Sequence, residues 1–137
     1  MNANDAQLTA VYPAHTGSTV ADDAPNAPGP AGNFDLVLEA VAGNAIGNSG
    51  GPYTLTATAI DDTAQAPVAG LSVPPTQQAF NGPSGWAANG PDFENTQVFN
   101  FAIPPGLSGH VLHYVASIVN QNAQVVSILE SDKFILV

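Results

Sequence analysis

Closely spaced glycines and prolines constrain this chain more than any other feature of its sequence. The 137 residues contain thirteen glycines and twelve prolines. No window of about eleven residues or more shows the 3.6-residue apolar period of an amphipathic helix. Between the breakers, apolar residues recur instead at every second position, which is the period of a strand with one buried face. The sequence therefore predicts short strands joined by turns, with helices of no more than a turn or two.

The alternation predicts an all-β fold. The clearest strands are residues 34–41, 52–60, 96–103 and 110–119. Shorter ones are expected at residues 7–13, 66–73, 124–129 and 133–137, with Pro74-Pro75 closing the segment 66–73. About seven to nine short strands with turns between them are typical of an antiparallel two-sheet β-sandwich, immunoglobulin-like or jelly-roll, and a closed barrel is the second choice. We expect a single domain, with an N-terminal strand or arm and a Pro/Gly-rich connector over 1–33 and the sandwich over 34–137.

One stretch resembles a known family. The sequence IPPGLSGHVLHYVASIV, residues 103–119, is similar to the turn and penultimate strand of fibronectin type III and other immunoglobulin-like domains. In those domains a Pro-Gly turn leads into a strand that bears a corner tyrosine. The resemblance implies sandwich architecture, and no binding residue is carried over from it.

The charge balance excludes several classes of partner. One basic residue, Lys133, stands against eleven Asp and Glu, for a net charge of -10. Proteins that bind nucleic acid neutralise phosphates with several Lys or Arg, and polybasic segments attract anionic membranes. No run approaches the roughly 18 apolar residues of a membrane-spanning helix. Neither nucleic acid nor membrane insertion is therefore expected, which leaves cations, neutral polar ligands and other protein surfaces.

Catalytic signatures are missing from the sequence. The chain has no cysteine, so thiol catalysis, disulfides and iron–sulfur ligation are excluded. No Gly-x-Ser-x-Gly turn, phosphate-binding loop or dinucleotide fingerprint occurs, and the serine of NSGG at 48–51 reads as part of a flexible loop. We do not expect an enzyme.

Two of the three histidines lie in the strand 110–119. His110 and His113 are three positions apart, and alternate residues of a strand face opposite sides. The two imidazoles therefore cannot bind one metal from a regular strand, and His15 is the only further candidate ligand. Both faces of the segment are apolar, which predicts a central strand whose histidines hydrogen-bond to backbone or water.

Paired carboxylates offer a candidate metal site. Asp61 and Asp62 directly follow a predicted strand. Calcium takes six to eight oxygen ligands, which the loops at one end of a sandwich can supply. The segment lacks the Asp-x-Asp-x-Asp-Gly spacing, and an Asp after a strand also caps turns. No cofactor is expected, with calcium at Asp61 and Asp62 left as the open alternative.

The breaker-rich segment 75–95 is predicted to be a long loop and is the main candidate for ligand binding. It holds the only tryptophan among amides and carboxylates. The candidate ligand-binding residues are Trp86, Asn89, Asp92 and Glu94. An aromatic ring beside such groups suits a neutral sugar. The other interpretation makes Trp86 a plug that folds the loop over an open end of the sandwich.

Two functions follow from these features. The first is a non-enzymatic structural or interaction module of a cell surface or a larger extracellular or virion assembly, which binds protein partners or self-assembles. The second is a lectin-like domain that binds a neutral glycan through 75–95, with or without calcium. An extracellular or surface location is expected, although the start MNANDAQLTA lacks the basic and apolar regions of a signal peptide, so none is predicted in this chain.

Overall fold

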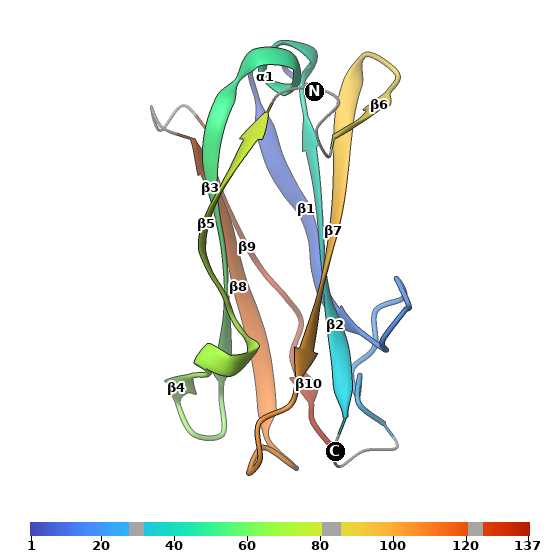
Figure 1. The fold of residues 1–137 in the computed structure, drawn as a ribbon, viewed down its shortest axis with the longest axis vertical. Coiled ribbons are helices and arrows are strands. Elements are labelled where there is room, and N and C mark those ends of the chain that lie inside the picture. The colour runs from blue at the N-terminus through green and yellow to red at the C-terminus, as the bar shows by residue number, and fades with distance from the viewer. Residues whose placement is uncertain (28–31, 81–85, 121–124) are drawn as a thin grey trace.

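Two antiparallel sheets pack face to face in an open β-sandwich (Figure 1). The computed structural model describes residues 1–27, 32–80, 86–120 and 125–137. The predicted two-sheet sandwich is confirmed, and the two separate sheets replace the closed barrel considered as its alternative. In these ranges, neither helix is long and apolar enough to cross a membrane.

The smaller sheet has four strands in the order β1-β2-β7-β6. Their bounds are Ala6–Ala14 for β1, Asn33–Ala42 for β2, Asp92–Ala102 for β7 and Ala87–Asn89 for β6. The pairing of β2 with β7 runs without a shift from Asn33 opposite Ala102 to Ala42 opposite Phe93. The first strand, β1, is thus an edge of this sheet, beside β2.

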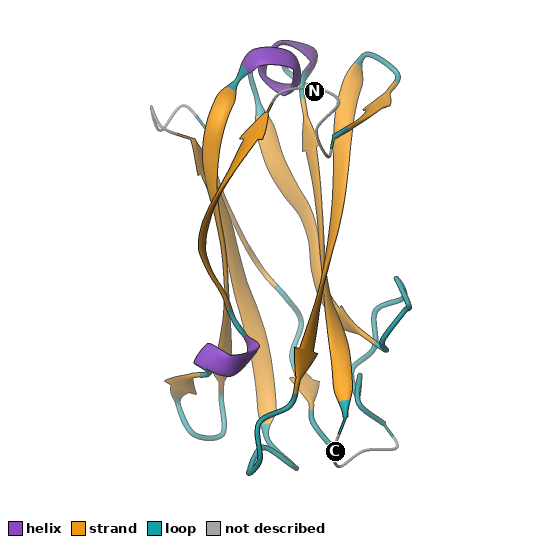
Figure 2. Cartoon of the chain, in the orientation of Figure 1, coloured by secondary structure: helices purple, strands orange, loops and turns teal. Residues whose placement is uncertain are grey.

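The larger sheet has six strands, with β8 and β3 at its centre. These two strands are Val111–Asn120 and Gly51–Asp61. On the far side of β8 lie β9 (Val126–Glu130) and β10 (Phe134–Ile135), and on the far side of β3 lie β4 (Ala66–Pro67) and β5 (Val73–Phe80). The central position predicted for the strand 110–119 is confirmed. Two short helices complete the described chain, α1 (Asn44–Ser49) and the 3₁₀ turn η1 (Ala69–Leu71) (Figure 2).

Residues at alternate positions of the central strands form the core. In β3 the inward side chains include Tyr53, Leu55, Ala57 and Ala59, and Thr54, Thr56 and Thr58 point outward, as the sequence predicts. Tyr114 of β8 is fully buried, stacks on Phe134 at a centroid distance of 5.7 Å and donates its hydroxyl proton to the Leu71 carbonyl at 2.7 Å. Burial raises the pKa of Tyr114. The hydroxyl thus links β8 to η1, distant in sequence, rather than forming a local corner.

Side-chain hydrogen bonds join the two sheets along both open sides. On one side the Leu8 amide of β1 donates to Ser127 Oγ of β9 at 2.9 Å, beside an irregularity of β1 between Leu8 and Ala10. On the other side the Gln78 and Gln97 amides of β5 and β7 donate to each other at 2.7 and 2.8 Å. Neutral polar groups therefore hold the sheet edges together.

The prediction of a loop over 75–95 is wrong for most of the segment. Strand β5 runs through Pro74-Pro75 to Phe80, and β6 and the start of β7 follow it, while residues 81–85 lie outside the described ranges. Strand β5 pairs only with β3 and is therefore an edge strand. Proline is tolerated there because the free side of an edge strand needs no amide donor. The predicted strand 66–73 is instead the two-residue β4, the turn η1 and the first residue of β5.

The NSGG stretch at 48–51, expected to be part of a flexible loop, begins inside α1. The helix lies close to β7. A methyl group added to the Cα of Gly47 would overlap the ring of Phe93. A six-residue helix is within the turn or two that the composition allows. It covers one end of the sandwich, where Ile46 joins the core.

Candidate functional site: the outer face of the six-stranded sheet

The outward side chains of β3, β8 and β9 form a continuous face. Strand pairing places them in rows across the sheet. The first row is Thr54, Val119 and Val126, the second is Thr56, Ser117 and Ile128, and the third is Thr58, Val115 and Glu130. We call these three rows the β3–β8–β9 face. Glu130 is its only charged member.

The aliphatic side chains at the edge of this face are unusually exposed. Val126 and Ile128 are 58 % and 65 % exposed. The central residues Val115 and Val119 are half-buried by their neighbours in the sheet. No described segment lies outside this layer (Figure 1). A contiguous apolar surface without a cover is typical of an interaction site.

The outer face of the four-stranded sheet has a different chemistry. Asp35 and Glu39 of β2 and Glu94 of β7 point outward there. We call this surface, with its strand neighbours, the β1–β2–β7 face. The segment 15–27 packs on one end of it, where Gly17 donates its amide proton to Asp35 Oδ2 at 2.8 Å and Tyr12 donates to the Thr19 carbonyl at 2.9 Å. This face is therefore acidic and partly covered.

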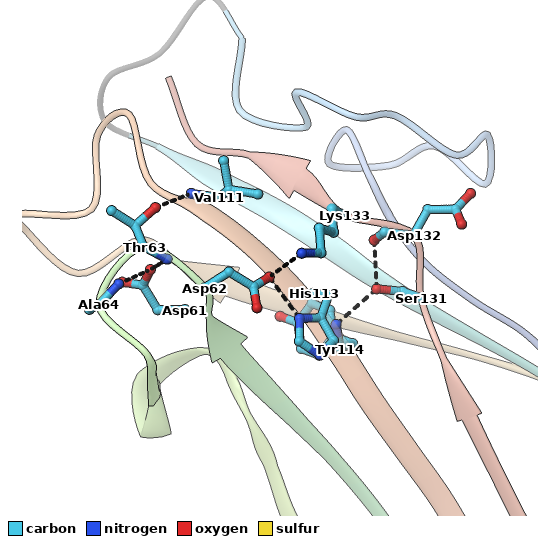
Figure 3. Close-up of polar contacts among 10 residues, drawn as sticks. All are labelled: Asp61, Asp62, Thr63, Ala64, Val111, His113, Tyr114, Ser131, Asp132 and Lys133. Carbon is cyan, nitrogen blue, oxygen red and sulfur yellow. Dashed lines mark hydrogen bonds and ion pairs between the residues drawn. The ribbon is translucent and has the colours of Figure 1, made fainter.

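A small charged cluster borders the β3–β8–β9 face at the end nearest the β3–β4 turn. His113 Nδ1 lies 2.8 Å from Asp62 Oδ2, and Lys133 Nζ lies 3.9 Å from the same oxygen (Figure 3). His113 stands opposite Ile60 in the sheet, in the row after Thr58 and Val115. Asp62 therefore pairs with the chain's single lysine and one imidazole, and its charge is locally offset.

The neighbouring Asp61 organises the turn itself. Its buried carboxylate accepts the amide protons of Thr63 and Ala64 at 3.0 and 3.1 Å and contacts His110 Nδ1 at 2.6 Å. Burial alone would raise the pKa of Asp61, but the His110 hydrogen bond, the two amides and the His110 charge outweigh it and hold the pKa below 3.8. Thr63 Oγ1 also accepts the Val111 amide proton at 3.0 Å, which ties the turn to β8 (Figure 3).

Each of the two aspartates predicted as calcium ligands thus contacts the imidazole of a different histidine. His113 of β8 and His110, the residue just before that strand, face opposite sides of the sheet, as the strand period predicts. The prediction that they hydrogen-bond to backbone or water is wrong, because each meets one carboxylate. In the described ranges no group of three or more His, Asp or Glu side chains is placed to hold a metal. A calcium ion at this turn would have to displace an imidazole from a carboxylate.

Trp86 lies inside the sandwich. Its side chain is 5 % exposed and packs against Phe80 at a centroid distance of 5.3 Å and edge-on to Tyr53 at 6.2 Å. This is the geometry of a plug. One edge of the indole still reaches a hollow of about 390 Å³ between β5 and β7, whose other walls are uncharged.

The other candidate ligand-binding residues lie apart from that hollow. Asn89 ends β6 opposite Asp92 of β7, and its side-chain amide donates to Glu94 Oε2 at 3.0 Å. Asn89 and Asp92 line a separate hollow of about 420 Å³ together with the first residues of the chain. The structure therefore brings Asn89, Asp92 and Glu94 together but separates them from Trp86.

Sequence reasoning did not single out Val126 or Ile128. Both belong to a strand that the sequence predicts, and they alternate with Ser127 and Leu129. The pattern shows that they share a face, but only the pairing of β9 with β8 shows that this face continues the threonines of β3. The surface can therefore be recognised from the strand pairing but not from the sequence pattern.

The fold and this surface define an open β-sandwich with one nearly uncharged outer face that no described segment covers. Comparisons with protein-family models, with curated proteins and with solved structures find no match to the chain.

Proposed function

We propose that this chain is a non-enzymatic β-sandwich interaction module that binds another protein through the β3–β8–β9 face. It would act as a structural unit of a cell surface or of a larger extracellular or virion assembly. The observation that carries the proposal is the exposed Val126–Ile128 edge of a face with one charged member. Burying such a face removes apolar area from water without stripping water from many ions.

The proposed role can be tested by site-specific photo-crosslinking in the cells that produce the protein. A photoreactive amino acid replaces Ile128 in one variant and Val98 in another. Val98 is the matched control because it is also an aliphatic, β-branched strand residue, 48 % exposed, on the outer face of the other sheet. Irradiation should give protein adducts from position 128 and few from position 98.

Two results would overturn the proposal. One is adduct formation from position 98 but not from position 128, which would assign docking to the other sheet. The other is the absence of protein adducts from both positions in cells that contain the folded variants.

The second candidate, binding of a neutral glycan, is favoured by the hollow beside Trp86. Tyr53, Gln78, Gln97 and Thr96 contribute to its walls without any charge. The amides of Gln78 and Gln97 already bond each other, so a sugar would have to compete with that pair. Titration with a panel of neutral sugars should shift the Trp86 emission if the hollow binds them. An unshifted, quencher-resistant emission in every titration, with and without calcium, eliminates this candidate.

A further inference from the structure

We infer that the partner on the β3–β8–β9 face is a second copy of this chain, packed sheet against sheet. The inference rests on the proposed function, since it names the occupant of the same face. It follows from three properties of the described residues, namely the distribution of charge, the area of the face and its self-complementary shape.

Of the two outer sheet faces, this one can meet a second copy with the fewest carboxylates brought together. The chain has a net charge of -10, so two copies repel each other wherever their carboxylates meet. The half-buried Glu39 and the exposed Glu94 make the β1–β2–β7 face such a place. The β3–β8–β9 face presents Glu130 alone, at one edge, and the charge of Asp62 beyond it is offset by Lys133. A basic partner would gain nothing from a face without carboxylates and would be drawn to the other sheet.

The area of the sheet suffices for a stable contact. Strand β8 has ten residues, and at about 3.4 Å per residue, with β5, β3, β8 and β9 about 4.8 Å apart, the whole outer surface of this sheet measures roughly 34 by 19 Å, with the β3–β8–β9 face as a part of it. Two copies packed across that whole surface would bury on the order of 1,300 Å². That value lies within the range of roughly 1,200–2,000 Å² found for specific interfaces.

The side chains suit a two-fold, face-to-face contact. Methyl groups of valine, isoleucine and threonine cover the face, and inner faces of sandwiches pack with the same residue types at roughly 30° between sheets. In a two-fold dimer each patch meets its own copy. Val126 and Ile128 of one chain would then fill the shallow surface over the threonines of β3 in the other.

The test is the oligomeric state of the purified chain as a function of concentration and salt. Sedimentation velocity should show a monomer–dimer equilibrium below about 1 mM chain. Added salt should strengthen the dimer, because screening reduces repulsion between two acidic chains, with a dissociation constant several-fold lower at about 0.5 M than at about 0.02 M salt.

Two charge-matched variants locate the contact. Ile128→Asp should weaken the dimer at least about tenfold, since it buries an unpaired carboxylate within the contact. Val98→Asp adds the same charge at an exposed position of the other sheet and should change the dissociation constant less than about twofold. Circular dichroism spectra of both variants establish that they are folded.

The outcomes separate this inference from the function on which it rests. A chain that stays monomeric at all concentrations and salts, together with adducts to a different protein from position 128 in cells, overturns the second copy and keeps the interaction face. A dimer that Val98→Asp disrupts and Ile128→Asp does not also overturns the inference. A monomer without adducts from position 128 overturns both.

Discussion

The two outer faces of this sandwich differ in the contacts that their side chains make with the rest of the chain. On the β1–β2–β7 face, Asp35 is almost completely buried and its two oxygens accept protons from Gly17 and Asn100, each at 2.8 Å. The segment 15–27 is fastened there. On the β3–β8–β9 face Val126 and Ile128 are 58 % and 65 % exposed, and no described segment lies outside this layer (Figure 1). One outer face is thus engaged by another segment of the chain, and the other is not covered by any described segment.

The largest stability effect expected from this difference comes from Asp35. Replacement by Ala removes the acceptor of two hydrogen bonds and leaves the Gly17 amide and the Asn100 side chain without it. We expect a loss of about 2–3 kcal/mol in the free energy of unfolding, measured by denaturant titration. Glu39→Ala, on the same strand and face but half-buried, should cost within about 0.5 kcal/mol. Equal losses for both variants would show that the segment 15–27 is not held by Asp35.

The adjacent carboxylates at the end of β3 give the next largest effect. The pKa of Asp61 is lower in the folded chain than its ordinary value of 3.8. Asp61 therefore stabilises the fold fully above that value, and the contribution is lost as the pH falls through the lower, folded-state pKa. Asp61→Asn should lose about 1–2 kcal/mol near neutral pH and lose less stability than the wild type on further acidification.

Asp62→Asn is the matched control for this prediction. Asp62 is the next residue, is partly exposed and lies on the His113 side of the turn. Its exposed pairing should contribute less than about 1 kcal/mol, and the acid loss due to Asp61 should remain. Unfolding midpoints of the three proteins between neutral pH and pH about 2 measure the difference. If the loss of stability on acidification persisted in Asp61→Asn and disappeared in Asp62→Asn, the acid sensitivity would belong to Asp62, which would contradict the prediction.

The smallest stability effect is expected on the bare face. Ile128→Ser should change the free energy of unfolding of the monomer by less than about 0.5 kcal/mol, because the side chain is 65 % exposed. The same variant should weaken association. Thermal unfolding at low chain concentration, where the monomer predominates, measures the first effect. A loss of several kcal/mol there would mean that Ile128 is part of the core rather than of an interaction surface.

The sequence predicts the sheets of this fold better than its edges. In β3 the inward and outward positions follow directly from the alternation of apolar residues with threonines. In β8 both faces are apolar, and this pattern correctly predicts the central position of the strand. In β5 the prolines and glutamines hide the period, since an edge strand with one pairing partner tolerates Pro74-Pro75 and half-exposed side chains. The prolines of this segment therefore favoured a loop where the chain in fact continues as a strand.

The candidate sites show a similar limit. The period of two separates His110 from His113, and the structure confirms that separation. The strand period does not reveal that Asp61 and Asp62 lie beside these histidines, because the register of β3 against β8 is a long-range pairing. Trp86 is an extreme case, since its neighbours Tyr53 and Phe80 come from strands that no local pattern assigns to it.

The most direct test of the docking surface is a residue-by-residue NMR comparison of dilute and concentrated samples of the intact chain. The backbone amide signals of Thr54, Val119 and Ile128 should shift with concentration, while those of Glu39 and Val98 stay in place. Shifts confined to the β1–β2–β7 face, or spectra unchanged across the range in which a dimer should form, would contradict the assignment of the β3–β8–β9 face to a second copy of this chain.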